Sequence, residues 1–187
     1  MFSELQKIKA DYKAALGGSK MQIKPPYKIS RKITVLTSFE FSVVLCFRCY
    51  SQLYKAKLLR IVSLLLYQLS KFLFKCDIHP SAEIGSGFHL VHGFNVIIGA
   101  DAQLETNVCL FDGVSIGKKN VGSTCGMPTI CKNTIVGTGA KLLGDIYIEE
   151  GALIGANSVV IHSVLGKNVN VAGIPAKVIR TQVDKAS

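Results

Sequence analysis

Residues 129–160 decide the fold, and they read TICKNTIVGTGAKLLGDIYIEEGALIGANSVV. An apolar residue returns at every sixth position of this stretch: Ile130, Val136, Leu142, Ile148, Ile154 and Val160. A period of six fits neither an amphipathic helix nor an alternating strand, whose periods are 3.6 and 2. It fits a solenoid in which each hexapeptide makes one flat side and a turn. Three sides close a triangular coil of 18 residues, with Ile130 stacked on Ile148 and Val136 on Ile154.

The same period extends back along the chain to Ile78. The fifth place of each hexapeptide is usually small or β-branched, which suits the limited space near a corner of the coil; the residues concerned are Ala82, Ala102, Val108, Val114, Thr134, Ala140, Ala152, Ser158 and Val164. The sequence therefore predicts a mainly β protein, a parallel β-helix that occupies residues 76–180.

The register of the repeat breaks twice. The step from Leu90 to Ile98 is eight residues, and the step from Ile116 to Ile130 is fourteen. Extra residues in a solenoid leave the wall as loops. The first loop holds His92, and the second spans 118–127. Because the loops lie about one coil apart, we expect them to frame a cleft.

The charge divides the chain near residue 75. Residues 1–75 carry 14 Lys and Arg against three acids, whereas residues 76–187 carry eight basic and nine acidic residues. The basic part has helical patterning over 3–16, 33–54 and 58–73, the last with a wide apolar stripe. We expect a basic N-terminal helical region (1–75), the β-helix (76–180) and a C-terminal tail (181–187). The helices are expected to pack on the protein or on a partner subunit, in preference to a membrane surface.

Other classes find little support. The first thirty residues carry six lysines and no apolar signal core, and no run reaches the roughly 18 apolar residues of a spanning helix. Six cysteines form no readable disulfide framework, so the cytoplasm, or the inner face of the membrane, is the expected location. Four histidines at these spacings make no metal site, and no nucleic-acid-binding motif accompanies the positive charge.

Two motifs carry a family resemblance. Residues 77–85 read DIHPSAEIG and are followed by His92-Gly93, and residues 172–180 read AGIPAKVIR. These stretches resemble the left-handed β-helix acyltransferases, especially serine acetyltransferase and the acetyltransferases of colanic-acid and capsule clusters. The resemblance covers about residues 76–180. It implies an acetyl-CoA-dependent O-acetyltransferase whose active sites lie between the subunits of a homotrimer.

The resemblance places the catalytic histidine on His92 and its aspartate partner on Asp77. O-acetyl transfer needs a base for the proton of the attacking alcohol, and a neutral imidazole suits that role. A carboxylate on the other ring nitrogen fixes the tautomer and stabilises the imidazolium. Without the resemblance, a packing role for His92 and a capping role for Asp77 remain open. His79 is expected to fix a turn, His89 is a weaker candidate for the cleft, and His162 is expected on the surface.

The resemblance also implies a groove for the pantetheine arm of acetyl-CoA. Small residues let a ligand approach the backbone, and the candidates are Gly117, Thr138, Gly139 and Ala156. Lys177 and Arg180 are expected to bind the phosphates. Glycine and alanine also suit turns, and for Gly139 that alternative is equally good.

The acceptor is inferred from departures from the serine acetyltransferase pattern. Val91 stands where that family has an aspartate, and Met127 where it has the histidine of a basic-histidine pair. Apolar side chains leave a zwitterion unmatched, so we expect a sugar hydroxyl of a capsular or exopolysaccharide glycan, contacted by Asp112, Lys118 and Met127. The alternatives are serine O-acetylation, a non-catalytic scaffold, and N-acetyl transfer to an amino sugar.

Overall fold

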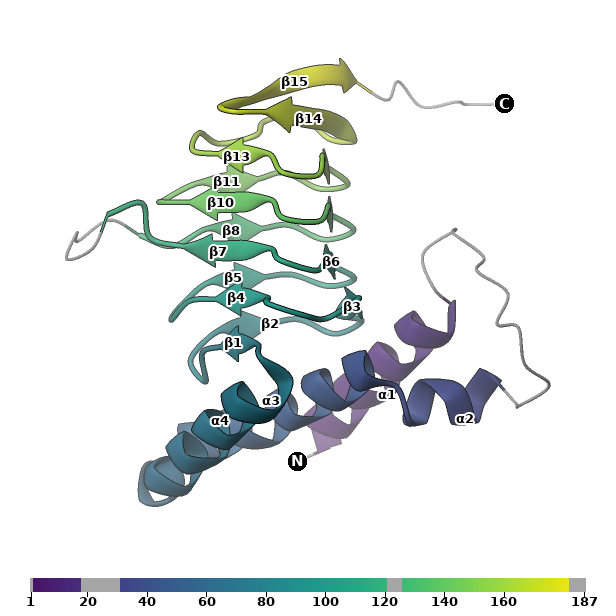
Figure 1. Cartoon of the computed structure of the whole chain (residues 1–187), viewed down its shortest axis with the longest axis vertical. Helices are drawn as coiled ribbons and strands as arrows, with labels where there is room; N and C mark the ends of the chain where they lie inside the picture. Colours follow the sequence, from purple (N-terminus) through teal and green to yellow (C-terminus); the bar gives the residue numbers. More distant parts are fainter. Residues whose placement is uncertain (1, 18–30, 121–125, 182–187) are drawn as a thin grey trace.

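The computed structural model describes residues 2–17, 31–120 and 126–181. Its helical elements gather at one end of the molecule (Figure 1). They are α1 (Phe2–Gly17), α2 (Arg31–Leu36), α3 (Phe39–Lys55), the single 3-10 turn η1 (Lys57–Leu59) and α4 (Arg60–Phe74). In the described residues from Asp77 onward, every regular element is a strand.

The strands form three sheets that are the three flat sides of a triangular prism. Sheet A has the order β1-β4-β7-β10-β13, sheet B has β2-β5-β8-β11, and sheet C has β3-β6-β9-β12-β14-β15. All pairs are parallel except the last, in which β15 returns antiparallel to β14 and ends the stack. The strand bounds are β1 (Asp77–Ile78), β2 (Glu83–Ile84), β3 (His89–Val91), β4 (Ile97–Ile98), β5 (Gln103–Leu104), β6 (Cys109–Phe111), β7 (Ser115–Gly117), β8 (Thr129–Ile130), β9 (Ile135–Val136), β10 (Lys141–Leu143), β11 (Tyr147–Ile148), β12 (Leu153–Ile154), β13 (Val159–Val160), β14 (Val169–Gly173) and β15 (Ala176–Thr181).

The apolar residue of each hexapeptide points into the prism. Ile130 pairs with Ile148, and Val136 pairs with Ile154, and all four side chains are almost fully buried. The small residues at the fifth position, such as Ala102, are buried as well. Each coil therefore stacks equivalent side chains on those of the next. The predicted left-handed β-helix with an N-terminal helical segment is confirmed.

Helix α3 lies across the open end of the first coil. The Arg48 guanidinium donates to the carbonyl of Ile84 at 2.6 Å and to that of Gly85 at 2.5 Å. Its Nε also donates to the Asp11 carboxylate at 2.9 Å, and both side chains are buried. A buried pair of this kind holds only when hydrogen bonds satisfy both groups, and here they join α1, α3 and the β-helix.

The apolar stretch 33–54, expected as one helix, is two. Helix α2 ends at Leu36, and α3 begins after Ser38, whose side chain accepts a hydrogen bond from the backbone N–H of Phe41 at 3.2 Å. A serine hydroxyl that caps the next helix satisfies an otherwise unpaired donor, and this favours a break over a continuous helix. The break turns the start of α3 toward β3.

Helix α4 packs with its polar side inward. Ser63, Tyr67 and Ser70 are buried, and Ser63 donates to the backbone of α3 at 2.7 Å. The apolar stripe faces outward, with the following side chains exposed: Leu58, Leu59, Ile61, Val62, Leu64, Leu65, Leu66, Leu69, Phe72 and Leu73. Packing of this stripe against the same chain, one of the expected arrangements, is therefore wrong. No helix in the described part of the chain has the length and hydropathy of a membrane span.

Candidate active site

His92 lies at the corner where sheet C ends and sheet A begins. It follows β3 directly, its side chain is exposed, and its backbone has a φ of +55°. The other described non-glycine residues with positive φ are asparagine, aspartate or lysine. A positive φ is uncommon outside glycine, although histidine, like asparagine and aspartate, adopts it more often than other residues do. Phe94, two residues on, stacks on Phe39 of α3 with ring centroids 4.5 Å apart, which fixes the loop against the helical segment.

Four of the expected site residues share this corner. Val91 pairs with Phe111, so Asp112 holds after β6 the place that His92 holds after β3. Val136 pairs with both Leu110 and Ile154, which puts Thr138 beside Asp112 and Ala156 beside Thr138. Neighbouring coils lie about 4.8 Å apart. The Thr138 hydroxyl donates to the Asp112 carboxylate at 2.9 Å. We call the edge formed by His92, Asp112, Thr138 and Ala156 the His92 corner.

A cavity of about 220 Å³ opens beside His92, between the first coil and the N-terminal helices. Its polar wall includes His89, Glu40 and Ser38, and Val91 lies among its apolar lining residues. Burial lowers the pKa of His89, an effect that the negative charge of Glu40 opposes. The His89 Nδ1 lies 3.9 Å from the thiol of Cys109. His89 therefore lines a cavity beside the N-terminal helices, whereas the cleft expected for it lay between the two loops.

Asp77 lies at the same corner but has its own partners. The strand β1 begins with Asp77, and the thiol of the preceding Cys76 donates to the carbonyl of Gly93 at 2.6 Å, next to His92. One carboxylate oxygen of Asp77 accepts a hydrogen bond from the Tyr67 hydroxyl, and the other accepts one from Lys71 at 2.7 Å. No hydrogen bond joins Asp77 to His92 within the described residues. The paired role stays a prediction.

The other two histidines lie where the sequence suggested. His79 fixes the turn after β1, because its Nδ1 accepts from the backbone N–H of Ser81 at 3.1 Å and lies 2.7 Å from the Ser81 hydroxyl. His162 is exposed. Within residues 2–17, 31–120 and 126–181, no three side chains of His, Cys, Asp or Glu gather closely enough to hold a metal ion.

The residues expected to bind acetyl-CoA lie in different parts of the prism. Gly139 follows Thr138 with a φ of +72°, and the equivalent position one coil on, Asn157, also has a positive φ, so this place in the turn favours glycine or asparagine. Gly117 ends β7 at the far side of sheet A, with open space where a Cβ would stand. Lys177 and Arg180 are exposed on β15 at the opposite end of the prism from the helices (Figure 1).

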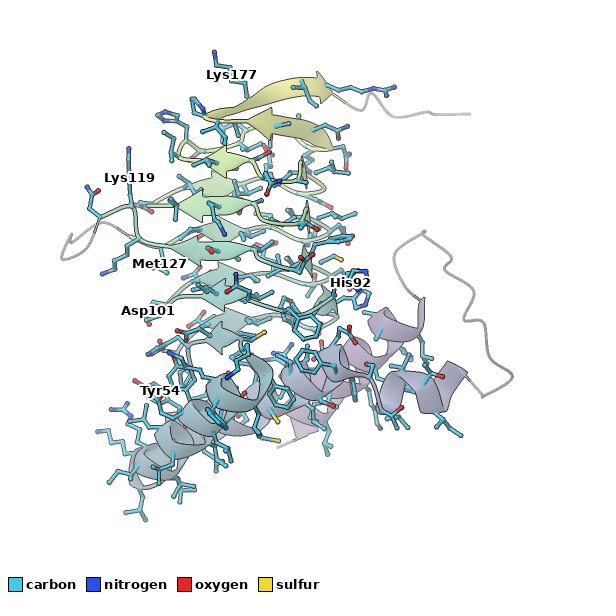
Figure 2. The ribbon with its side chains drawn as sticks, viewed as in Figure 1. Tyr54, His92, Asp101, Lys119, Met127 and Lys177 are labelled. Carbon is cyan, nitrogen blue, oxygen red and sulfur yellow. The ribbon has the colours of Figure 1, made fainter. Side chains whose placement is uncertain are left out.

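The two loops do not frame a cleft within one chain. Figure 2 shows Met127 and Lys119 at one side of the prism and His92 at the other, because the second loop leaves sheet A where that sheet ends rather than where it begins. Met127 packs against the core of the β-helix, and its methyl group fills the space beside Gly99. Lys118 is exposed at the start of this loop, and residues 121–125 lie outside the described part of the chain.

Sequence reasoning missed three residues around the first coil: Glu40, which lines the cavity beside His92, and Tyr67 and Lys71, which bind Asp77. All three come from helices, and only the packing of α3 and α4 against the first coil brings them to this corner. Glu40 alone had a local signal, because an acid in the first turn after a capping serine marks a helix start.

Known proteins are similar to this chain in sequence and in structure. Serine acetyltransferase of Bacillus subtilis (strain 168) is 38% identical over 148 residues, which are 78% of this chain and 66% of that enzyme. The crystal structure of serine acetyltransferase from Brucella abortus strain S19 matches at a TM-score of 0.81 and 32% identity, over 92% of this chain and 67% of that one. This chain belongs to the serine acetyltransferase family of hexapeptide-repeat acyltransferases. The Neisseria gonorrhoeae serine acetyltransferase structure has a TM-score of 0.86 at 27% identity, over 98% of this chain and 69% of that one.

The family relationship does not extend over the relatives' full length. The chain spans 66% of the Bacillus subtilis enzyme and 56% of a serine acetyltransferase from Synechococcus elongatus. No protein-family model matches the sequence. A second structure of the Brucella abortus protein, 34% identical to this chain, is a complex with coenzyme A.

Proposed function

We propose that this chain is an acetyl-CoA-dependent O-acetyltransferase with His92 as general base, and that L-serine is its acceptor. The observation that supports it most is the position of His92, at the mouth of a small cavity and at the head of a column of small and polar residues. Acetyl-CoA fits this column, because Thr138 and Ala156 present little side-chain bulk along the corner. The serine acetyltransferase relatives support the acceptor.

In this reaction His92 acts first as a base and then as an acid, and it carries the same proton from the acceptor to the leaving thiolate. The imidazole takes the proton of the acceptor hydroxyl as its oxygen attacks the carbonyl carbon of the thioester. The C–S bond of the tetrahedral intermediate then breaks, and the imidazolium returns the proton to the sulfur. The products are the acetyl ester and free CoA. The tetrahedral oxyanion needs hydrogen-bond donors, and we assign this role to backbone N–H groups of the coil.

The experiment compares CoA release by the wild type and by His92→Asn. Asparagine tolerates the positive φ of this position, so the substitution removes the base and keeps the loop. We expect kcat to fall by about 10²- to 10⁴-fold, while acetyl-CoA binding, measured by calorimetry, stays unchanged. A variant with wild-type kcat would exclude His92 as the base.

A glycan hydroxyl is the second candidate acceptor. Val91 favours it, because this apolar side chain lines the cavity beside His92 where the family pattern has an acid. The relatives do not support this expectation. The same assay with capsular and exopolysaccharide fragments separates the two, since release that needs a glycan and ignores L-serine would replace the serine proposal.

We also propose that the chain works as a homotrimer. His92 and the second loop lie at different corners of one prism, so a site that uses both requires two chains. The outward apolar side chains of α4 offer a surface for a second copy. Asp77, at the same corner as His92, is proposed to stabilise the imidazolium. Lys177 and Arg180 are proposed to bind the phosphates of acetyl-CoA.

A further inference from the structure

We propose that Glu40 is the specificity-determining residue of the acceptor site and binds an ammonium group of the acceptor in the cavity beside His92. This inference rests on the proposed function and assigns to a helix of the N-terminal segment a role in the reaction. Glu40 and His92 line the same cavity of about 220 Å³. One water occupies about 30 Å³, so the space admits a small acceptor.

The position of Glu40 is built into the fold. It lies in the first turn of α3, where the Ser38 cap fixes the start of the helix. Its backbone approaches the His92 loop, because a Cβ on Gly93 would lie 3.7 Å from the Glu40 Cα. The stacked pair Phe39–Phe94 clamps the same two segments together. The carboxylate is therefore carried on a rigid element rather than on a mobile side of the cavity.

The charged side chains of the described lining do not pair with the Glu40 carboxylate. Asp11 also lines the cavity, but its carboxylate is occupied by Arg48 and by the backbone N–H of Phe88 at 2.9 Å. Lys and Arg are missing from the described lining, and burial lowers the pKa of His89, which favours its neutral form. Among the described residues, the Glu40 carboxylate has no hydrogen bond or ion pair. Within the described lining, no basic side chain compensates the negative charge of Glu40, and a cationic group on the acceptor matches it.

The test measures acceptor kinetics of Glu40→Gln, which keeps shape and removes charge. For L-serine we expect KM to rise about ten- to hundredfold, the range for a lost hydrogen bond to a charged group, with the KM for acetyl-CoA unchanged. We also expect the preference for L-serine over glycerate, which has a hydroxyl in place of the amino group, to fall by a similar factor. Glu83→Gln is the matched control, because Glu83 is an exposed carboxylate of the first coil on sheet B.

The outcomes separate this proposal from the proposed function. Calorimetry of L-serine binding, without turnover, should show binding retained in His92→Asn and lost in Glu40→Gln. A serine KM within twofold of wild type in Glu40→Gln overturns the role of Glu40 and leaves the acetyltransferase proposal standing. Wild-type turnover with glycerate as good as with L-serine also overturns it. Wild-type protein that neither binds nor acetylates L-serine overturns both.

Discussion

At the scale of single residues, the His92 corner combines groups with separate tasks. His92 stands in a left-handed backbone conformation that presents its ring outward. Asp77 is held from the other side by Tyr67 and Lys71. The corner therefore holds a candidate base, His92, and a carboxylate, Asp77, that is fixed by its own partners. Substitutions can decide whether each group has a catalytic or a structural role.

Asp77→Asn answers that question for the carboxylate. Its ion pair with Lys71 is more than one third exposed on each side, and such pairs contribute at most about 1 kcal/mol to stability. We expect a melting temperature close to that of the wild type and a kcat at least about tenfold lower, because the imidazolium loses a stabilising charge. Lys71→Gln is the control and should keep most of the activity. A stable Asp77→Asn protein with full kcat would make Asp77 a purely structural residue.

Because of His89, we expect the stability of the fold to fall as the pH falls below neutral. Burial lowers its pKa in the folded state below the ordinary 6.5. Above that value His89 is neutral in both states and has no effect; below it the unfolded chain binds the proton first, so stability falls as the pH falls. We expect the melting temperature of the wild type to drop more between about pH 7 and pH 5.5 than that of His89→Gln. Parallel curves for the two proteins would contradict this.

At the scale of elements, the attachment of α3 to the first coil depends on Arg48. Arg48→Met removes the cation, leaves the buried Asp11 without its partner and strips the carbonyls of Ile84 and Gly85 of their donors. Breaking a buried pair costs about 3–5 kcal/mol. We expect the free energy of unfolding, from denaturant titration, to fall by that amount, and Lys55→Met on the exposed side of α3 to change it little. An equal effect of the two substitutions would contradict the assignment.

The elements differ in how far the sequence predicts them. The β-helix follows from the sequence alone, because each hexapeptide repeats one local rule and its partner lies one coil away. The sequence predicts helical segments in the N-terminal region, but not the break between α2 and α3. It also leaves open the side on which α4 packs, since leucines at helical spacing specify a stripe and not its partner. Likewise His92 was marked by a motif and a register break, whereas Glu40 reaches the cavity only through the docking of α3.

At the scale of the whole molecule, we expect the exposed apolar face of α4 to be covered by another copy of the chain. Leu58 of η1 is 94% exposed and Leu65 of α4 is 66% exposed, and proteins rarely leave so long an apolar face uncovered. We expect light scattering to give three times the 20.2 kDa of one chain. Leu65→Glu should shift this mass toward the monomer. A wild-type mass of one chain would contradict the trimer, and flotation of that monomer with anionic vesicles would assign the face to a membrane instead.

The structure of the two ends of the prism bears on whether the β-helix can polymerise end to end. A stack of identical coils has no intrinsic length, since each exposed coil offers unpaired carbonyls to the next molecule as a fibril does. At one end, Arg48 and the Tyr50 hydroxyl occupy the carbonyls of Ile84, Gly85 and Ile78, the last at 2.7 Å. At the other, β15 turns back antiparallel and carries the charges of Lys177 and Arg180. Both features oppose end-to-end polymerisation of the repeat, and the helical segment supplies one of them as well as lining the cavity.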